Sequence, residues 1–275
     1  IPSSSTMRMT ISFWRNIISK NSHLLIALSI ATVISCARIN ADRLSDSPVI
    51  PQQILETIPS DKQIHVILPV LPGRMIPGRE MIDKIERMIV NAGSDDVDYF
   101  VCVPEGSLTA EDKRAIRIDH RKERFLEVPL GALESSTGFS GSKPGILFLV
   151  DNSGKVIESG NILKPDDRQR FYDRLNPDIS PTEISISSPD IYPCSCRMDT
   201  TVWLKNNGES DLVVYETEAS CTCSSVELDN RVIIPGDSAA LHIVYHNTKG
   251  KGFVSTIIVY SSSNKSPHAI RIHAD

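Results

Sequence analysis

Six cysteines carry most of the chemistry that this sequence could perform. Four of them form two Cys-x-Cys pairs, Cys194 with Cys196 and Cys221 with Cys223. Residues two apart share one face of an extended chain, so each pair presents both thiols on the same side. Dithiols of this kind form disulfides, bind soft metal ions or exchange disulfides with other thiols.

These three interpretations stay open for the two pairs. Structural disulfides are the default for an even number of cysteines in an exported protein, and four cysteines allow three connectivities. A thiolate site for zinc or Cu(I) is chemically possible, although zinc sites more often place two residues between their cysteines. Thiol–disulfide exchange needs a lowered thiol pKa, and Arg197 is the one positive neighbour in sequence that could lower it.

A further cysteine, Cys36, follows an apolar run at the N-terminus. The run covers residues 24–34, and Arg8, Arg15 and Lys20 precede it. It is too short for a permanent span of a hydrocarbon core of roughly 30 Å, but it suits the core of a signal peptide. Residues 1–36 are therefore predicted to be an export signal.

The end of this run, Val33-Ile34-Ser35-Cys36, resembles the lipobox of bacterial lipoproteins. The resemblance implies cleavage before Cys36 and acylation of its thiol, as in palmitate-bearing lipoproteins. The protein would then be anchored by lipid to a membrane of the cell envelope, on the periplasmic or the cell-surface face. An ordinary cleaved signal peptide with an incidental cysteine is the alternative.

Composition excludes two classes of function. The 275 residues have a net charge of −5, so no broad positive field would attract nucleic acid. One apolar run alone approaches the length of a membrane span, which excludes a multi-span membrane protein. The length suggests about two folded domains.

The first domain is predicted to be α/β. After a polar tether over 37–60, the region 61–176 alternates strand and helix patterns. The expected strands are 64–68, 98–103 and a hairpin over 146–158, and the expected helices are 81–92, 111–124 and 166–175. A short helix over 50–58 is possible within the tether.

This order is similar to that of thioredoxin-like domains. The family's Cys-x-Pro-Cys-Arg motif is matched by Met75-Ile76-Pro77-Gly78-Arg79, and its conserved proline before the hairpin is matched by Pro144. Met75 and Gly78 stand where the family has its two cysteines, which implies a redox-inactive domain. Cys102, inside an apolar strand, is expected to be a buried core residue. The loop beside Pro144 would be a patch for a peptide or partner protein, or simply part of a spacer.

Beyond a linker over 177–183, the region 184–275 is predicted to be all β. Seven short strands separated by turns indicate an immunoglobulin-like (Ig-like) sandwich. The expected strands are 183–187, 200–205, 211–217, 225–228, 239–246, 253–260 and 268–273.

A second resemblance covers most of this region. Asn206-Asn207-Gly208, Leu212-Val213-Val214, Ser220-Cys221-Thr222-Cys223-Ser224 and Pro235-Gly236-Asp237-Ser238 resemble an uncharacterised bacterial Ig-like family. Its motif is typically S-C-G-C-T, so Thr222 and Ser224 depart from it. The family is common in exported lipoproteins, and the resemblance implies a fold and a location but no reaction.

No nucleophile triad, paired-carboxylate motif, zinc-protease motif or phosphate-binding loop is found in the sequence. We therefore expect a membrane-anchored, non-catalytic envelope lipoprotein that binds a protein partner through its two domains, with no cofactor and no metal. The alternative is a thiol-based role for the paired cysteines of the Ig-like domain, either soft-metal binding or disulfide exchange.

Overall fold

The computed structural model describes residues 50–59, 61–70, 79–118, 122–135, 139, 145–247 and 252–274. The predicted lipidation site Cys36 lies outside these residues, as do the four redox-loop positions Met75, Pro77, Gly78 and Pro144. Among the described residues, no helix is both long and apolar enough to cross a membrane. The chain from residue 48 onward forms one compact unit.

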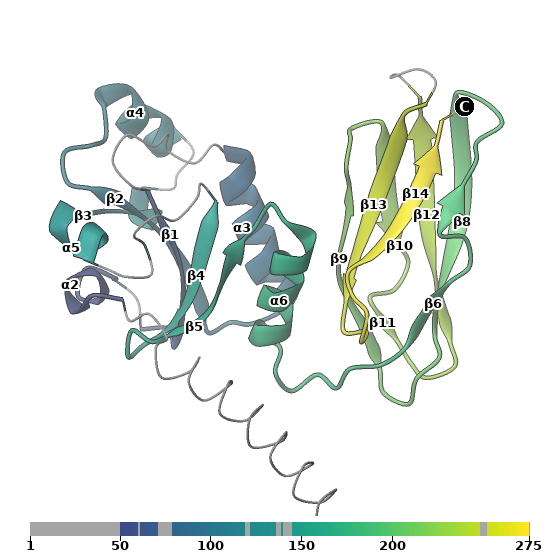
Figure 1. Ribbon diagram of the computed structural model, residues 1–275, viewed down its shortest axis with the longest axis horizontal. Coiled ribbons are helices and arrows are strands. Elements are labelled where there is room, and N and C mark those ends of the chain that lie inside the picture. The colour runs from purple at the N-terminus through teal and green to yellow at the C-terminus, as the bar shows by residue number, and fades with distance from the viewer. Residues whose placement is uncertain are drawn as a thin grey trace, which may run out of the picture. The chain divides into compact units, whose positions relative to one another are not determined.

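The first part of this unit, the α/β domain, is built on a five-stranded mixed sheet (Figure 1). Its strand order is β3-β2-β1-β4-β5, with β1, β2 and β3 parallel to one another, β4 antiparallel to β1, and β5 antiparallel to β4. The strands are β1 (Ile64–Pro69), β2 (Val97–Pro104), β3 (Phe125–Val128), β4 (Ile146–Asp151) and β5 (Val156–Asn161). Apolar, β-branched runs predict the central strands because both of their faces are buried.

Two helices cover one face of this sheet. They are α3 (Arg79–Ala92) and α6 (Pro165–Leu175). On α3, Ile82, Ile85 and Met88 recur at helical spacing and are buried against sheet residues that include Val66 and Leu149. Pro165 stands in the first turn of α6, where its fixed φ and missing N–H cost nothing.

The opposite face is covered by α2 (Gln52–Leu55) and α5 (Leu130–Ser135). Ile50 and Ile54 are buried there against Ile67 and Phe148. The Ile50 N–H also donates to the Gly154 carbonyl in the β4–β5 turn at 2.9 Å. The tether predicted over 37–60 is therefore wrong for its last part, because these apolar side chains complete the core of the sheet.

Three further parts of the α/β domain differ from the prediction. The charged helix expected over 111–124 is instead α4 (Ala110–Ile118) followed by a separate 3-10 turn, η1 (Lys122–Arg124). Strand β3 and helix α5 were not predicted. β3 is a short edge strand with mixed polarity, so it lacks the apolar run that marks the central strands.

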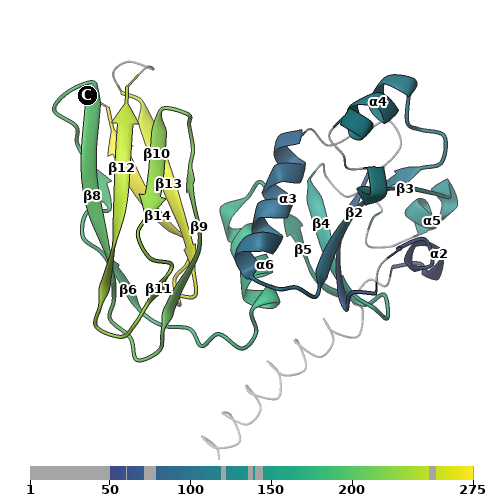
Figure 2. The same ribbon diagram turned by 180° about the vertical axis from the view of Figure 1, so that it is seen from behind.

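The second part of the unit is a sandwich of two sheets (Figure 2). One sheet has the order β10-β12-β8-β6 and the other β11-β9-β13-β14-β7. Alternate residues of both sheets, among them Leu204, Leu241, Val214 and Ile257, fill the core between them. The strands are β6 (Ile184–Ile186), β7 (Asp190–Ile191), β8 (Arg197–Asn206), β9 (Leu212–Ala219), β10 (Ser224–Leu228), β11 (Val232–Ile233), β12 (Ser238–His246), β13 (Val254–Ser261) and β14 (His268–His273).

All seven strands predicted for this region are present. The two missed strands, β7 and β11, each have two residues, too few for an alternation pattern to be recognised.

A buried ion-pair network joins α6 to β9. Arg168 is 1% exposed, and its guanidinium donates to Glu216 at 3.3 Å and to Glu218 at 2.7 Å. The same group donates twice to the Ile162 carbonyl, at 3.0 and 3.1 Å. The Tyr172 hydroxyl donates to Glu216 at 2.9 Å. Lys84 and Arg87 on α3 also pair with Glu218 and Glu216, so each carboxylate has two cationic partners that offset the cost of burying its charge.

Apolar and backbone contacts extend the junction. The rings of Tyr172 and Tyr215 stack with centroids 4.9 Å apart, and the Arg168 guanidinium lies 5.0 Å from the centroid of Tyr260. The Gln169 side-chain amide pairs with the backbone of Ser261, donating to its carbonyl at 2.8 Å and accepting from its N–H at 3.3 Å. The α/β domain and the sandwich thus share part of one buried core.

The junction is expected to weaken in acid. Burial opposes the charged form of Glu218, but hydrogen bonds and charges from Lys84 and Arg168 outweigh it and lower the pKa below its ordinary 4.5. A lowered carboxyl pKa contributes stability above the unfolded value, and this stability is lost as pH falls through the folded value. Urea unfolding between pH 6 and pH 3 should show this loss. The dependence should flatten in Glu218→Gln, and an unchanged dependence in that variant would contradict the assignment.

Candidate functional site

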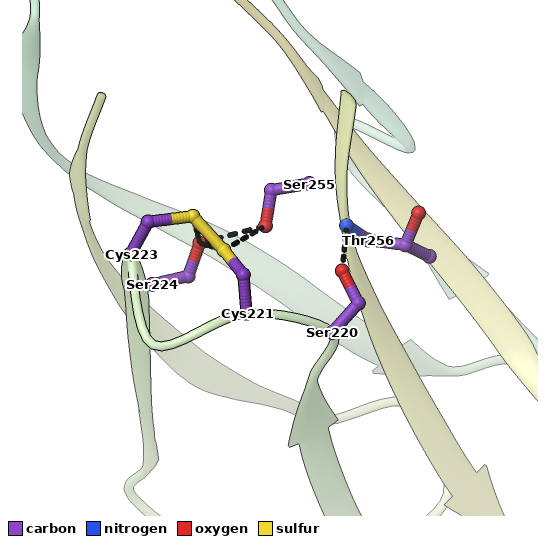
Figure 3. The surroundings of a disulfide bond; sticks show 6 residues. All are labelled: Ser220, Cys221, Cys223, Ser224, Ser255 and Thr256. Carbon is purple, nitrogen blue, oxygen red and sulfur yellow. Dashed lines mark hydrogen bonds between the residues drawn. A yellow bond between two sulfur atoms is a disulfide. The ribbon is translucent and has the colours of Figure 1, made fainter. Parts of the chain in front are cut away.

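A disulfide occupies the turn by which the chain passes from one sheet of the sandwich to the other. It joins Cys221 to Cys223, just after β9 and just before β10, with the two Cα atoms 5.2 Å apart (Figure 3). Ser220 anchors the turn to β13. Its hydroxyl accepts from the Thr256 N–H at 2.9 Å, and its own N–H donates to the Thr256 carbonyl at 2.8 Å.

Two buried hydroxyl groups lie beside the disulfide (Figure 3). Ser224 and Ser255 are 8% and 0% exposed, and their Oγ atoms are 2.8 Å apart. The Ser255 Oγ is 3.3 Å from the Cys221 Sγ, whereas the Ser224 Oγ is 3.9 Å from both sulfurs. A donor aimed at a sulfur stabilises its thiolate. When the disulfide opens, Ser255 is therefore placed to donate to the Cys221 sulfur.

The other cysteine pair flanks the same end of the sandwich. Cys194 and Cys196 are exposed free thiols in a bend just before β8, and the Cys196 carbonyl accepts from the Asn247 N–H at 2.7 Å. The Cys223 carbonyl accepts from the His246 N–H at 2.8 Å. Strand β12 ends here and lies between β8 and β10. The two pairs are thus two strand spacings, about 10 Å, apart.

This placement limits what the four cysteines form. A disulfide needs Cα atoms within about 7 Å, so bonds between the pairs are not made in this arrangement. Of the pairings that the sequence left open, the structure contains the Cys221–Cys223 disulfide, whereas Cys194 and Cys196 are free. Within the described ranges, no three His, Cys, Asp or Glu side chains are grouped to hold a metal ion. The four sulfurs therefore do not form a tetrathiolate site in this structure.

The Cys221–Cys223 bond should add little to stability. It closes a loop with one intervening residue, for which the chain-entropy relation gives about 1.5 kcal/mol, half the value for a 15-residue loop. We expect Cys221→Ser/Cys223→Ser to lower the free energy of unfolding by no more than about 1.5 kcal/mol in urea denaturation. A loss above about 3 kcal/mol would make the disulfide a structural staple instead.

The other segments of the resemblance, around Asn206, Gly208 and Pro235, lie at the opposite end of β8. This end is about 30 Å along the strand from the cysteines. Asn206 is fully buried, and its amide donates to the carbonyls of Ser210 and Ile233, both at 2.8 Å. Its side-chain oxygen accepts from the Thr182 hydroxyl at 3.1 Å and from the Gly208 N–H at 3.0 Å. Every hydrogen-bonding position of this amide is satisfied, which gives Asn206 a structural role.

The turn at Pro235 and Gly236 is hydrogen-bonded to the backbone of Asn206. Gly236 has a φ of +81° and follows Pro235, and the Asp237 N–H donates to the Ile234 carbonyl at 3.1 Å, as in a type II turn. The Asn206 carbonyl accepts from the Gly236 N–H at 3.0 Å. The motif of the sandwich thus separates into a structural end around Asn206 and an end that carries the cysteines.

Gly208 is required by close packing at the structural end. A Cβ at this position would lie 2.0 Å from the Thr182 hydroxyl oxygen and 2.9 Å from the Glu183 nitrogen. We expect Gly208→Ala to lower the free energy of unfolding by about 1–3 kcal/mol. In the control, Gly131→Ala in α5, the Cβ meets nothing within 4 Å and stability should rise slightly. Thermal unfolding compares the two, and equal shifts would contradict the packing argument.

The one cysteine of the α/β domain is enclosed in the protein core and is not available for thiol chemistry. Cys102 is 0% exposed within β2, as predicted, and burial raises the pKa of its thiol to about 12. The thiol therefore stays neutral and enclosed at physiological pH.

Sequence reasoning identified the four cysteines of the sandwich but missed the hydroxyls beside them. Ser224 stands in the motif, whereas Ser255 lies on β13 in the facing sheet, 34 residues after Cys221. Only strand pairing across the fold brings Ser255 to the sulfur, so no local sequence signal marks it.

A protein family of unknown function matches the C-terminal part of the chain. The family described as "Protein of unknown function (DUF1573)" matches residues 193–275, which include both cysteine pairs and the structural end. No curated protein matches the chain.

Three solved structures are similar to parts of the chain. A protein of unknown function from Porphyromonas gingivalis W83 is 12% identical over 47% of this chain and 62% of its own, with a TM-score of 0.32. A thiol:disulfide interchange protein from Bacteroides sp. is 14% identical over 42% of this chain and 73% of its own, with a TM-score of 0.29. StoA from Bacillus subtilis is 16% identical over 42% of this chain and 84% of its own, also at 0.29. Likenesses this weak add no argument about function.

Proposed function

We propose that the protein is a non-catalytic lipoprotein of the bacterial cell envelope. Acylated Cys36 anchors it, and a thioredoxin-like domain and an Ig-like sandwich together bind a protein partner. The thioredoxin-like domain corresponds to the α/β domain, predicted over 61–176 and extended here to Ile50 by the packing of α2. The sandwich corresponds to 184–275.

The observation that carries this proposal is the buried junction around Arg168. Because charges, aromatic rings and backbone groups are matched across it, the α/β domain and the sandwich act as one body rather than as two modules on a string. The buried, neutral Cys102 favours a binding role over a redox role for the α/β domain.

Site-specific crosslinking tests partner binding on both domains. Val90 on α3 and Trp203 on β8 are large apolar side chains that are 75% and 51% exposed, so they give one probe position on each domain. We expect a photo-crosslinking residue at each of these positions to give an adduct with the same envelope protein in intact cells. A crosslinker at the exposed polar Glu111 on α4 is the control. Adducts absent from both positions, or equal at all three, would refute the proposal.

The anchor is tested separately. Membrane fractionation should show the wild-type protein in the membrane fraction and Cys36→Ser in the soluble fraction, because the thiol that receives the lipid is gone. Unchanged partitioning of Cys36→Ser would exclude the lipoprotein assignment and leave partner binding to be judged on the crosslinks.

A further inference from the structure

The proposed partner binding makes no use of the two cysteine pairs at one end of the sandwich. One pair, Cys221 with Cys223, is a disulfide, and the other, Cys194 with Cys196, is an exposed dithiol. Both pairs flank the end of β12, held there by backbone hydrogen bonds to His246 and Asn247. The end of one sheet therefore carries an oxidised and a reduced pair side by side.

We propose that the two pairs exchange one disulfide, which makes this end of the sandwich a thiol–disulfide exchange site. This activity goes beyond partner binding and does not depend on it. The exposed pair is the one that meets outside thiols, and its substrate class is a protein dithiol or disulfide of the envelope. The sheltered Cys221–Cys223 pair stores the disulfide.

The exchange has two balanced steps. In the first, the Cys196 thiolate attacks the Cys223 sulfur, the Cys221–Cys223 bond breaks, and the Cys221 sulfur leaves as a thiolate. In the second, the Cys194 thiolate attacks the Cys196 sulfur and releases Cys223. The Cys194–Cys196 disulfide is formed, and the two protons lost by that pair are taken up by Cys221 and Cys223.

Two features of the site favour this route. The sulfur that leaves first, on Cys221, is the one 3.3 Å from the Ser255 hydroxyl, and a hydrogen bond from that hydroxyl stabilises a leaving thiolate. The sulfur that is attacked belongs to Cys223, which lies across a single strand from Cys196.

One movement is required. The pairs are about 10 Å apart across β12, and a mixed disulfide needs Cα atoms within about 7 Å. The segment that must move contains Cys194 and Cys196. It is an exposed bend outside any strand, and its approach breaks the hydrogen bond from the Asn247 N–H to the Cys196 carbonyl. The Cys221–Cys223 turn, in contrast, is held to β13 through both hydrogen bonds of Ser220. The dithiol is thus the pair that approaches.

Trapping the mixed disulfide tests the proposal. In the full chain with Cys36→Ser, the variant Cys194→Ser/Cys221→Ser leaves Cys196 and Cys223 to react. We expect diamide to give an intramolecular Cys196–Cys223 bond at least tenfold faster than the Cys194–Cys221 bond in the control, Cys196→Ser/Cys223→Ser, as read by peptide mapping. Equal rates, or dimers alone, would overturn the route.

A second measurement keeps all four cysteines. The fully reduced chain, again with Cys36→Ser, receives one equivalent of diamide and is quenched in acid at intervals. We expect the disulfide to form first at Cys194–Cys196 and then to transfer to Cys221–Cys223, and Ser255→Ala to slow the transfer severalfold. A disulfide that stays in the pair where it first forms would overturn the proposal.

Discussion

Replacing Arg168 with methionine is expected to lower the free energy of unfolding by about 3–5 kcal/mol. The substitution keeps much of the side-chain length but removes the charge shared by Glu216, which is 7% exposed, and Glu218. Arg87 and Lys84 remain as partners of Glu216 and Glu218, but the Ile162 carbonyl loses both donors from Arg168. Removing one partner of a buried ion pair costs more than the net value of the pair, because the remaining charge stays desolvated with fewer partners. Urea unfolding followed by circular dichroism measures the change.

The neighbouring Arg170 provides a matched control. It lies on the same helix and pairs with Glu158 and Asp167, but its side chain is 46% exposed. Arg170→Met should therefore cost at most about 1 kcal/mol. If the two variants lost equal stability, Arg168 would not be the centre of a buried junction. Separate unfolding transitions for the α/β domain and the sandwich in Arg168→Met alone would support the junction as their coupling.

Asn206→Asp is expected to lower the free energy of unfolding by about 3 kcal/mol or more. The carboxylate keeps the shape of the amide but loses both donors, so it would face the carbonyls of Ser210 and Ile233 at about hydrogen-bond distance without a proton to share. A buried, unpaired charge adds its own desolvation cost. Thermal and urea unfolding should both show the loss.

The adjacent Asn207 provides a control in which the same substitution is made at an exposed side chain. Its side chain is exposed, so Asn207→Asp should change stability by no more than about 0.5 kcal/mol. Because Asn206 lies about 30 Å along β8 from the cysteines, mild denaturation in Asn206→Asp should not alter which cysteines are paired in the folded fraction. A change in pairing would mean that the two ends of the sandwich are coupled.

The sequence predicts the elements whose signal is local. The strand expected over 268–273 has the same bounds as β14, and the helix expected over 81–92 lies within α3, whose buried residues recur at helical spacing. Strand β3 and helix α5 were missed because a short edge strand and a short covering helix are stabilised by what they pack on rather than by their own pattern.

The burial of polar side chains at the junction between α6 and the sandwich could not be predicted from the local sequence. The sequence of α6 is strongly charged, yet Arg168 and Gln169 are buried. Their partners, Glu216 and Ser261, lie on strands of the sandwich, 48 and 92 residues further along the chain. Burial of a charge depends on a distant opposite charge, and no local window contains that information.

The sequence indicates the kind of chemistry at the candidate site but not its geometry, because the geometry depends on contacts between distant segments. The cysteine spacing indicates disulfide, metal or exchange chemistry, and the position of Cys102 inside an apolar strand indicates a buried thiol. Which cysteines pair, and which hydroxyl lies beside them, depends on the crossing from β9 to β10 and on the register of β13.

Site-resolved alkylation of the native full chain shows whether accessible thiol chemistry resides in the sandwich and not in the α/β domain. We expect rapid labelling of Cys194 and Cys196 without reductant, labelling of Cys221 and Cys223 only after reduction, and labelling of Cys102 only after unfolding. Native labelling of Cys102, or protection of Cys194 and Cys196, would contradict it.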